Sequence, residues 1–107
     1  MIITGGENVS SIEVEDAVFS HPAVAEVAVI GVPDDKWGEM VTALVVLVDG
    51  ATVTEAELIA HTRERIAGYK APKRVEFREA IPRTATGKVQ KFKLRQQYWQ
   101  GQQRQIN

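Results

Sequence analysis

The sequence has no cysteine, which excludes disulfide bonds, zinc–thiolate sites and cysteine nucleophiles. It also has no apolar run of the ~18 residues that a membrane-spanning helix needs, and no charged-then-apolar signal peptide at its start. These absences lead us to expect a cytoplasmic chain without a membrane span. The chain has 107 residues, 44% of them hydrophobic and 25% charged, which is ordinary composition for one folded domain.

The charges are unevenly distributed along the chain, although the net charge is only -1. Residues 1–61 contain eleven acids and one base, Lys36, whereas residues 62–107 contain twelve bases and three acids. Such a split can indicate an anionic ligand or an acidic partner surface. It can equally mean that the two halves pair with each other in the fold, and charge alone favours this second interpretation.

Hydrophobic periodicity and turn residues predict strands over residues 1–4, 24–32, 40–48 and 74–78. The strand over 40–48 is almost wholly apolar, so we expect it at the centre of its sheet and covered on both faces. Capping boxes predict helices that begin after Ser10 and Thr54, with Gly68 as the C-terminal cap of the second. A third helix is predicted over 90–99. The order βαββαβα indicates an α+β domain with a three-stranded sheet and packed helices.

The segment from Pro82 to Lys88 ends like a phosphate-binding P-loop but fails that pattern twice. Pro82 stands where the motif needs glycine, and Val89 stands where it needs serine or threonine. What remains is Lys88, a lysine on a loop after a glycine. It could act as a point charge toward phosphate or be an ordinary solvated lysine.

Two adjacent glycines, Gly5 and Gly6, directly precede the first capped helix. Their backbone N–H groups could meet an anion or an extended ligand, or they could simply form a turn. His21 and His61 have no acidic neighbours at metal-ligand spacing, so we expect no metal site. Trp37 is interpreted as a packing residue at a hairpin end.

Several segments together, in order and spacing, resemble the C-terminal domain of acyl-CoA synthetases. These enzymes belong to the adenylate-forming superfamily. The resemblance extends from Met1 to about Tyr98, so we predict a C-terminal lid domain over residues 1–100 and a frayed tail over 101–107. The matching segments are MIITGGEN (1–8), EVE (13–15), HPAV (21–24), VPDDKWGE (32–39), YKAPK (69–73) and PRTATGK (82–88).

The resemblance implies an acid–thiol ligase that joins a carboxylic acid to ATP and then passes the acyl group to coenzyme A. A large N-terminal domain would be the partner, and Mg²⁺ would bind mainly outside this chain. Lys88 would be the adenylation lysine and contact the nucleotide. Gly5 and Gly6 would line the coenzyme A tunnel, and Arg63 and Lys70 would meet coenzyme A phosphates.

The resemblance also suggests that this chain is a separately expressed domain or a fragment, inactive alone. Ser10-Ser11, Trp37 and residues 88–92 are similar to the short- and medium-chain members. One alternative is a free-standing module that binds an anion or a nucleic acid. Phe77 is the only aromatic residue in a predicted strand, which argues against nucleic acid as a partner.

Overall fold

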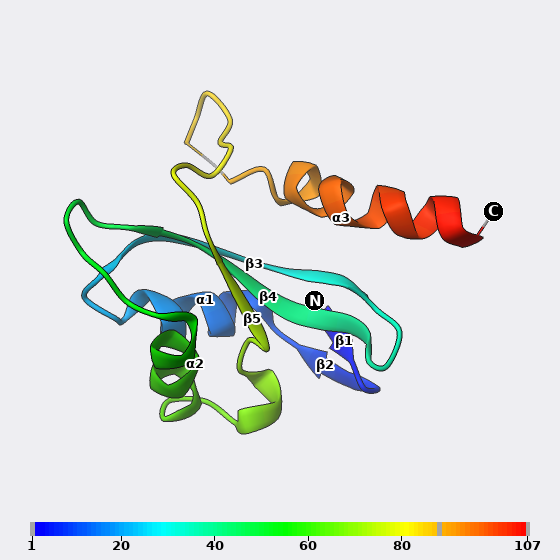
Figure 1. Cartoon of the computed structure of the whole chain (residues 1–107), viewed down its shortest axis with the longest axis horizontal. Coiled ribbons are helices and arrows are strands. Elements are labelled where there is room, and N and C mark those ends of the chain that lie inside the picture. The colour runs from blue at the N-terminus through cyan, green and yellow to red at the C-terminus, as the bar shows by residue number, and fades with distance from the viewer. Residues whose placement is uncertain (1, 88, 107) are drawn as a thin grey trace.

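The computed structural model describes residues 2–87 and 89–106, and the side chains of 2–87 and 89–99. Lys88 therefore lies outside the described residues. The elements follow one another as ββαββαβα, with a short 3₁₀ turn before the last strand (Figure 1). They are β1 (Ile2–Thr4), β2 (Glu7–Val9), α1 (Ser11–Phe19), β3 (Val24–Asp34), β4 (Gly38–Leu47), α2 (Glu55–Arg63), η1 (Gly68–Lys70), β5 (Arg74–Phe77) and α3 (Lys91–Ile106).

The described strands form one five-stranded sheet around β4. One edge of β4 pairs with β3 along the whole hairpin. The other edge pairs with β1 at Gly38 and, farther along, in parallel with β5. The α+β class is confirmed, but the predicted three-stranded sheet is wrong. The prediction missed β2, which has only three residues, and it did not join the first segment to the sheet.

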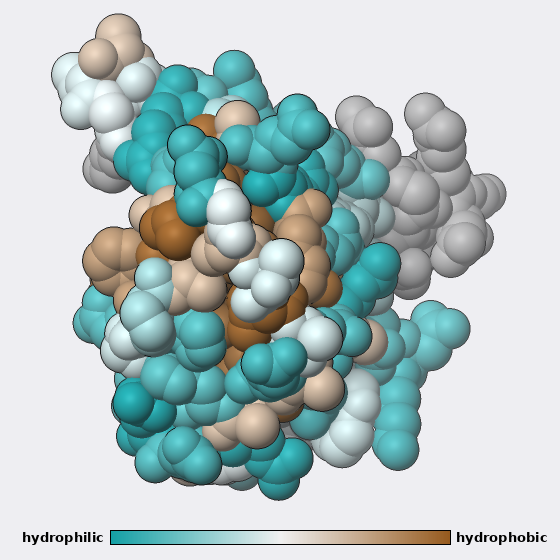
Figure 2. All heavy atoms as spheres, turned by 60° about the vertical axis from the view of Figure 1, so that its left-hand side comes forward, coloured by the Kyte–Doolittle hydropathy of each residue, from teal (hydrophilic) through white to brown (hydrophobic). Residues whose placement is uncertain are grey.

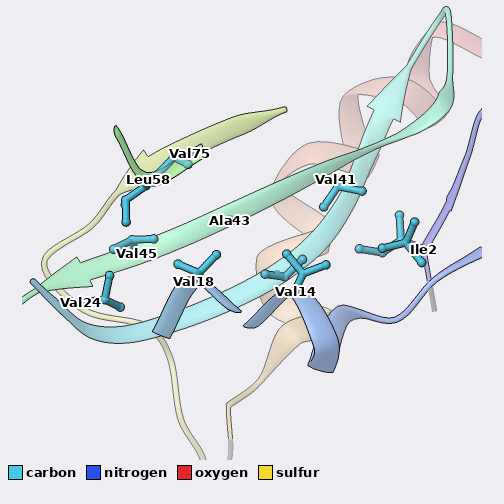
Figure 3. Packing of buried hydrophobic residues seen from close by; sticks show 11 residues of the cluster. Ile2, Val14, Val18, Val24, Val41, Ala43, Val45, Leu58 and Val75 are labelled. Carbon is cyan, nitrogen blue, oxygen red and sulfur yellow. The ribbon is translucent and has the colours of Figure 1, made fainter. Parts of the chain in front are cut away.

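Helices cover both faces of β4, as predicted for its apolar sequence. On one face, Val41, Ala43 and Val45 pack with residues of α1 and α2 (Figure 3). On the other face, Leu44 packs with Leu94 of α3. All five of these side chains are fully buried, so the sheet holds the helices on its two sides in fixed positions.

Two of the predicted helix boundaries differ from the structure. Both N-terminal caps are confirmed, because Ser10 and Thr54 each accept a hydrogen bond from the third backbone N–H of their helix. However, α2 already ends at Arg63, and Gly68 begins η1 instead of capping the helix. Likewise, α3 continues past the predicted end at Trp99.

Some apolar side chains remain at the surface. Figure 2 shows apolar residues in the middle of one face within a rim of hydrophilic ones. Val48 and Phe77 are among the exposed large hydrophobic residues of the chain. Among the described helices, none combines the length and the apolar character needed to span a bilayer.

Candidate functional site

The Gly5–Gly6 pair forms the two-residue turn of the β1–β2 hairpin. Thr4 pairs with Glu7 across it, and both glycines have positive φ, +57° and +83°. Two positive φ values are what a type I′ hairpin turn requires, which explains glycine at both positions. The glycine pair therefore forms a turn, one of its two interpretations, and its contact with a ligand stays a prediction.

The two glycines have different surroundings. A Cβ atom on Gly5 would lie 2.8 Å from a ring carbon of Trp37, whereas one on Gly6 would meet nothing within 4 Å. Gly5 also donates its N–H to the Trp37 carbonyl at 2.9 Å. Gly5 thus packs on the domain, while Gly6 faces open space, where a ligand or another domain can approach.

Two lysines lie close to the Trp37 ring. The ammonium groups of Lys36 and Lys73 are 5.0 and 4.7 Å from its ring centroid, within the range of a cation–π contact. Because the ring also packs on Gly5, the tryptophan is a packing residue, as predicted. It places two positive charges next to the glycine turn.

The loop over residues 83–89 is closed on itself. Arg83 and Val89 form an isolated antiparallel bridge, and the N–H of Gln90 bonds to the carbonyl of Pro82 at 3.0 Å. Inside the loop, the Gly87 N–H bonds to the Thr84 carbonyl at 2.9 Å. Position 88 itself lies outside the described residues, but the backbone on both sides of it is held.

The Arg83 side chain fixes this loop to the sheet. Its Nε donates to the Glu26 carboxylate of β3 at 2.8 Å, and its Nη1 donates to the Gly87 carbonyl at 2.8 Å. A second Glu26 contact comes from Nη2. One guanidinium therefore joins β3 to the residue that directly precedes Lys88.

A second ion pair holds the chain after the loop. Lys91 at the start of α3 lies 2.6 Å from the Glu15 carboxylate of α1 and donates to Ser11 at 3.0 Å. The same Glu15 oxygen accepts the Val29 N–H of β3 at 2.8 Å. Glu15 thus joins α1, β3 and α3 at one point.

The two elements that flank the loop, β5 and α3, are also tied to each other. Tyr98 donates its hydroxyl proton to Glu76 at 2.7 Å and accepts from Arg78 at 2.9 Å. Burial, followed by the Glu76 hydrogen bond, raises the pKa of Tyr98. The hydroxyl therefore keeps its proton and the contact persists at neutral pH.

Of the two predicted coenzyme A contacts outside the turn, one is occupied within the chain. Lys70 lies 3.0 Å from Glu13, and the hydrogen bond and charge of Glu13 raise the pKa of Lys70. Arg63 at the end of α2 is exposed, and its guanidinium lies near Gly68. Within the residues that the structure describes, no carboxylate pairs with Arg63, so its charge is available to a ligand.

The uneven charge distribution is explained in part by pairing between the two halves. Four described ion pairs join an acid of residues 1–61 to a base of residues 62–107, and they are Lys70–Glu13, Arg83–Glu26, Lys91–Glu15 and Arg95–Glu39. Internal pairing was the interpretation that charge alone favoured.

His21 and His61 come together, although they are far apart in the sequence. Their ring centroids are 4.9 Å apart at an edge-to-face angle, and the His61 Nε2 lies 2.8 Å from the Ser20 hydroxyl. Burial, and then the charges of Arg65 and His21, lower the pKa of His61. Across the described part of the chain, no group of three or more His, Cys, Asp or Glu residues is arranged to hold a metal ion.

Residues 13–88 match the family described as the AMP-binding enzyme C-terminal domain. The chain belongs to this family. It is 52% identical over 98 residues to the probable CoA ligase CCL11 of Humulus lupulus, covering 90% of this chain and 17% of that protein. It is also 52% identical over 98 residues to the long-chain-fatty-acid–CoA ligase FadD13 of Mycobacterium tuberculosis, covering 92% and 19%.

Solved structures of such enzymes contain the same C-terminal domain. The Brucella canis acyl-CoA synthetase superposes with a TM-score of 0.89 at 36% identity, covering 94% of this chain and 19% of that one. A Mycobacterium tuberculosis fatty acyl CoA synthetase superposes with a TM-score of 0.86 at 51% identity, covering 92% of this chain and 19% of that one. The chain thus spans less than a fifth of the length of these relatives.

In this C-terminal domain, the two candidate regions lie at opposite ends of the β3–β4 hairpin (Figure 1). Arg83 anchors the 83–89 loop at Glu26, near the start of β3. Trp37 holds the glycine turn beyond the end of β3. The nine residues from Glu26 to Asp34 span roughly 25 Å in an extended strand. The two regions therefore cannot face one small ligand at the same time.

Proposed function

We propose that this chain is the mobile C-terminal domain of an ATP-dependent acyl-CoA synthetase. Such an enzyme converts a carboxylic acid, ATP and coenzyme A into acyl-CoA, AMP and pyrophosphate. The observation that supports this most directly is the family match, which ends at Lys88. The partner of the chain would be the large N-terminal domain of the same enzyme. A cytoplasmic location stays a prediction, as does inactivity of the chain alone.

In the first half-reaction, a carboxylate oxygen attacks the α-phosphorus of ATP and pyrophosphate leaves. Lys88 would stabilise the charge that moves between the carboxylate and the α-phosphate, because its ammonium is a preorganised positive group. Mg²⁺, which we expect to be bound mainly outside this chain, would neutralise the phosphate oxygens. The loop of residues 83–89, which Arg83 ties to Glu26 and to the Gly87 carbonyl, would hold Lys88 in one orientation.

In the second half-reaction, the coenzyme A thiol attacks the acyl carbonyl and AMP leaves. Gly5 and Gly6 would line the passage of the pantetheine arm, and the open space around Gly6 supports this role. Arg63, which has no ion-pair partner among the described residues, would offer its guanidinium to a coenzyme A phosphate, whereas Lys70 would first have to leave Glu13.

The separation of the two regions supports a domain that changes its pose between the half-reactions. One pose would bring the Lys88 loop to the acid and ATP, and the other would bring the glycine turn to the thiol. The names of relatives cover long-chain fatty acids, trans-cinnamate and 4-hydroxybutyrate. This variety supports a domain that serves acids of different size, and a preference for short or medium chains stays a prediction.

A hybrid enzyme tests the proposal. In this hybrid, residues 2–99 of the chain replace the matching region of FadD13 from Mycobacterium tuberculosis. We expect the hybrid to form acyl-CoA, whereas the FadD13 part without any C-terminal domain does not. A folded hybrid that performs neither half-reaction would contradict the proposal.

A further inference from the structure

The VPDDKWGE segment (32–39) has no assigned role in either half-reaction, although it lies against the glycine turn. β1 is a strand of three residues, and its register with β4 consists of Thr4 opposite Gly38. This single pair leaves the turn little backbone support from the sheet. The position of Gly5 and Gly6 must therefore depend on further contacts.

Two backbone N–H groups on the same side of β1 and the glycine turn make those contacts. In a hairpin, alternate residues turn their N–H groups away from the partner strand. Ile3 and Gly5 do so here, away from β2. Gly5 donates to the Trp37 carbonyl at 2.9 Å, and Ile3 donates to the Glu39 carboxylate at 2.8 Å. Residues 37–39 therefore supply both acceptors on this side of β1, the Trp37 carbonyl next to the Thr4–Gly38 pair and the Glu39 carboxylate.

The Glu39 carboxylate is itself held in place. Its side chain is only 17% exposed and lies 3.5 Å from Arg95 of α3. Gly31 of β3 leaves the room for it, because a Cβ atom there would come 2.6 Å from Glu39 Oε1. A glutamate at this position therefore has one preferred place, between β3, α3 and β1.

We propose that Glu39 is a positioning residue that fixes the Gly5–Gly6 turn and thereby supports thioester formation. This inference rests on the proposed role of the turn in the second half-reaction. Glu39 acts through the backbone N–H of Ile3. The acceptor oxygen is the feature that matters, and the negative charge toward Arg95 is secondary.

The first test is structural and needs no activity. Amide hydrogen exchange is measured on the 107-residue chain and on the Glu39→Ala and Glu39→Gln variants. We expect Glu39→Ala to speed exchange at Ile3 and Gly5 by at least tenfold, while buried amides of β4 keep their protection. Glu39→Gln retains an acceptor oxygen and should stay within about threefold of the parent. Unchanged protection at Ile3 in Glu39→Ala would overturn the inference, whether or not the chain has its proposed function.

The second test uses the hybrid enzyme and the two half-reactions. Glu39→Ala should lower the rate of thioester formation at least tenfold and leave adenylation within twofold, and Glu39→Gln should recover most of the loss. Arg95→Ala should have a smaller effect than Glu39→Ala. Glu79→Ala, an exposed glutamate without a partner among the described residues, is the control and should leave both rates unchanged.

The outcomes separate this inference from the proposed function. If Gly6→Leu blocks thioester formation but Glu39→Ala does not, the turn has its proposed role and the positioning role of Glu39 is wrong. If Gly6→Leu leaves thioester formation intact, the proposed role of the turn is wrong. The claim that Glu39 supports thioester formation is then wrong as well, whereas the hydrogen-exchange test of its contact with Ile3 still stands.

Discussion

Arg83 and Glu26 are 57 positions apart in the sequence and form a charge-assisted hydrogen bond at 2.8 Å. The same guanidinium also bonds to the Gly87 carbonyl. The pair therefore couples the 83–89 loop to β3, the edge strand of the sheet. If Lys88 has its proposed charge-stabilising role, its loop needs such rigidity, because small displacements of that group cost catalytic rate.

The first prediction concerns this clamp. In the hybrid enzyme, Arg83→Gln should lower the rate of adenylation by about tenfold, since a loss of ~1.4 kcal/mol in the positioning of a catalytic group corresponds to a factor of ten. Thioester formation from a pre-made acyl-adenylate should change little. The rates are measured by ATP–pyrophosphate exchange and by acyl-CoA formation.

Two further variants control for this result. Lys93→Gln removes an exposed positive charge from α3 and should leave both rates unchanged. The double variant Arg83→Glu with Glu26→Arg should recover part of the loss, because the pair is reversed but kept. An Arg83→Gln enzyme with normal adenylation would show that the clamp is structural only.

A second prediction concerns the junction at Glu15. Glu15→Ala should lower the free energy of unfolding by about 1–3 kcal/mol, because it removes the acceptor of the Val29 N–H and leaves Lys91 without its partner. Asp16, the next residue of α1, is exposed. Asp16→Ala should therefore change the free energy of unfolding by less than about 0.5 kcal/mol. Urea unfolding of the 107-residue chain gives both values, and equal effects would contradict the junction.

The two glycines of the turn should respond differently to alanine. Gly6→Ala adds only the strain of a side chain at positive φ, about 1 kcal/mol. Gly5→Ala adds the same strain and also overlap with the Trp37 ring, so its cost should be greater, about 2–3 kcal/mol. Urea unfolding compares the two variants, and a larger loss for Gly6→Ala would contradict the described packing.

A pH dependence follows from His61. Its pKa in the folded chain is lowered, first by burial, so the unfolded chain takes up a proton more readily as the pH falls below the ordinary value of 6.5. Stability should therefore decline from that pH down to the lowered pKa and be independent of His61 below it. Urea midpoints between pH 7.5 and 5 should fall less in His61→Gln. An identical decline in both proteins would contradict the shift.

Much of the fold could be predicted from the sequence because its signals are local. The apolar run of β4, the serine and threonine caps of α1 and α2, and the glycine turn each depend on neighbouring residues. The short strand β2 could not be predicted in this way, because three residues carry no periodicity. The prediction that Gly68 caps α2 is wrong, because α2 already ends at Arg63 and Gly68 begins η1.

The residues of the candidate site likewise differ in whether a local sequence signal identifies them. Lys88, Gly5 and Gly6 stand out because of the motifs around them. Arg83, Glu15 and Glu39 do not, because their partners are distant in sequence and only the fold brings them together. The charge split was the one available signal for such long-range pairs, and it did not identify the partners.

The central claim is that Lys88 serves adenylation alone, and one variant tests it directly. In the hybrid enzyme, Lys88→Ala should lower ATP–pyrophosphate exchange by about 10²–10³-fold, the scale expected for loss of one preorganised charge-stabilising group. Thioester formation from a pre-made acyl-adenylate should remain close to that of the parent. An equal loss of both half-reactions in a normally folded Lys88→Ala enzyme, or no loss of either, would contradict the account.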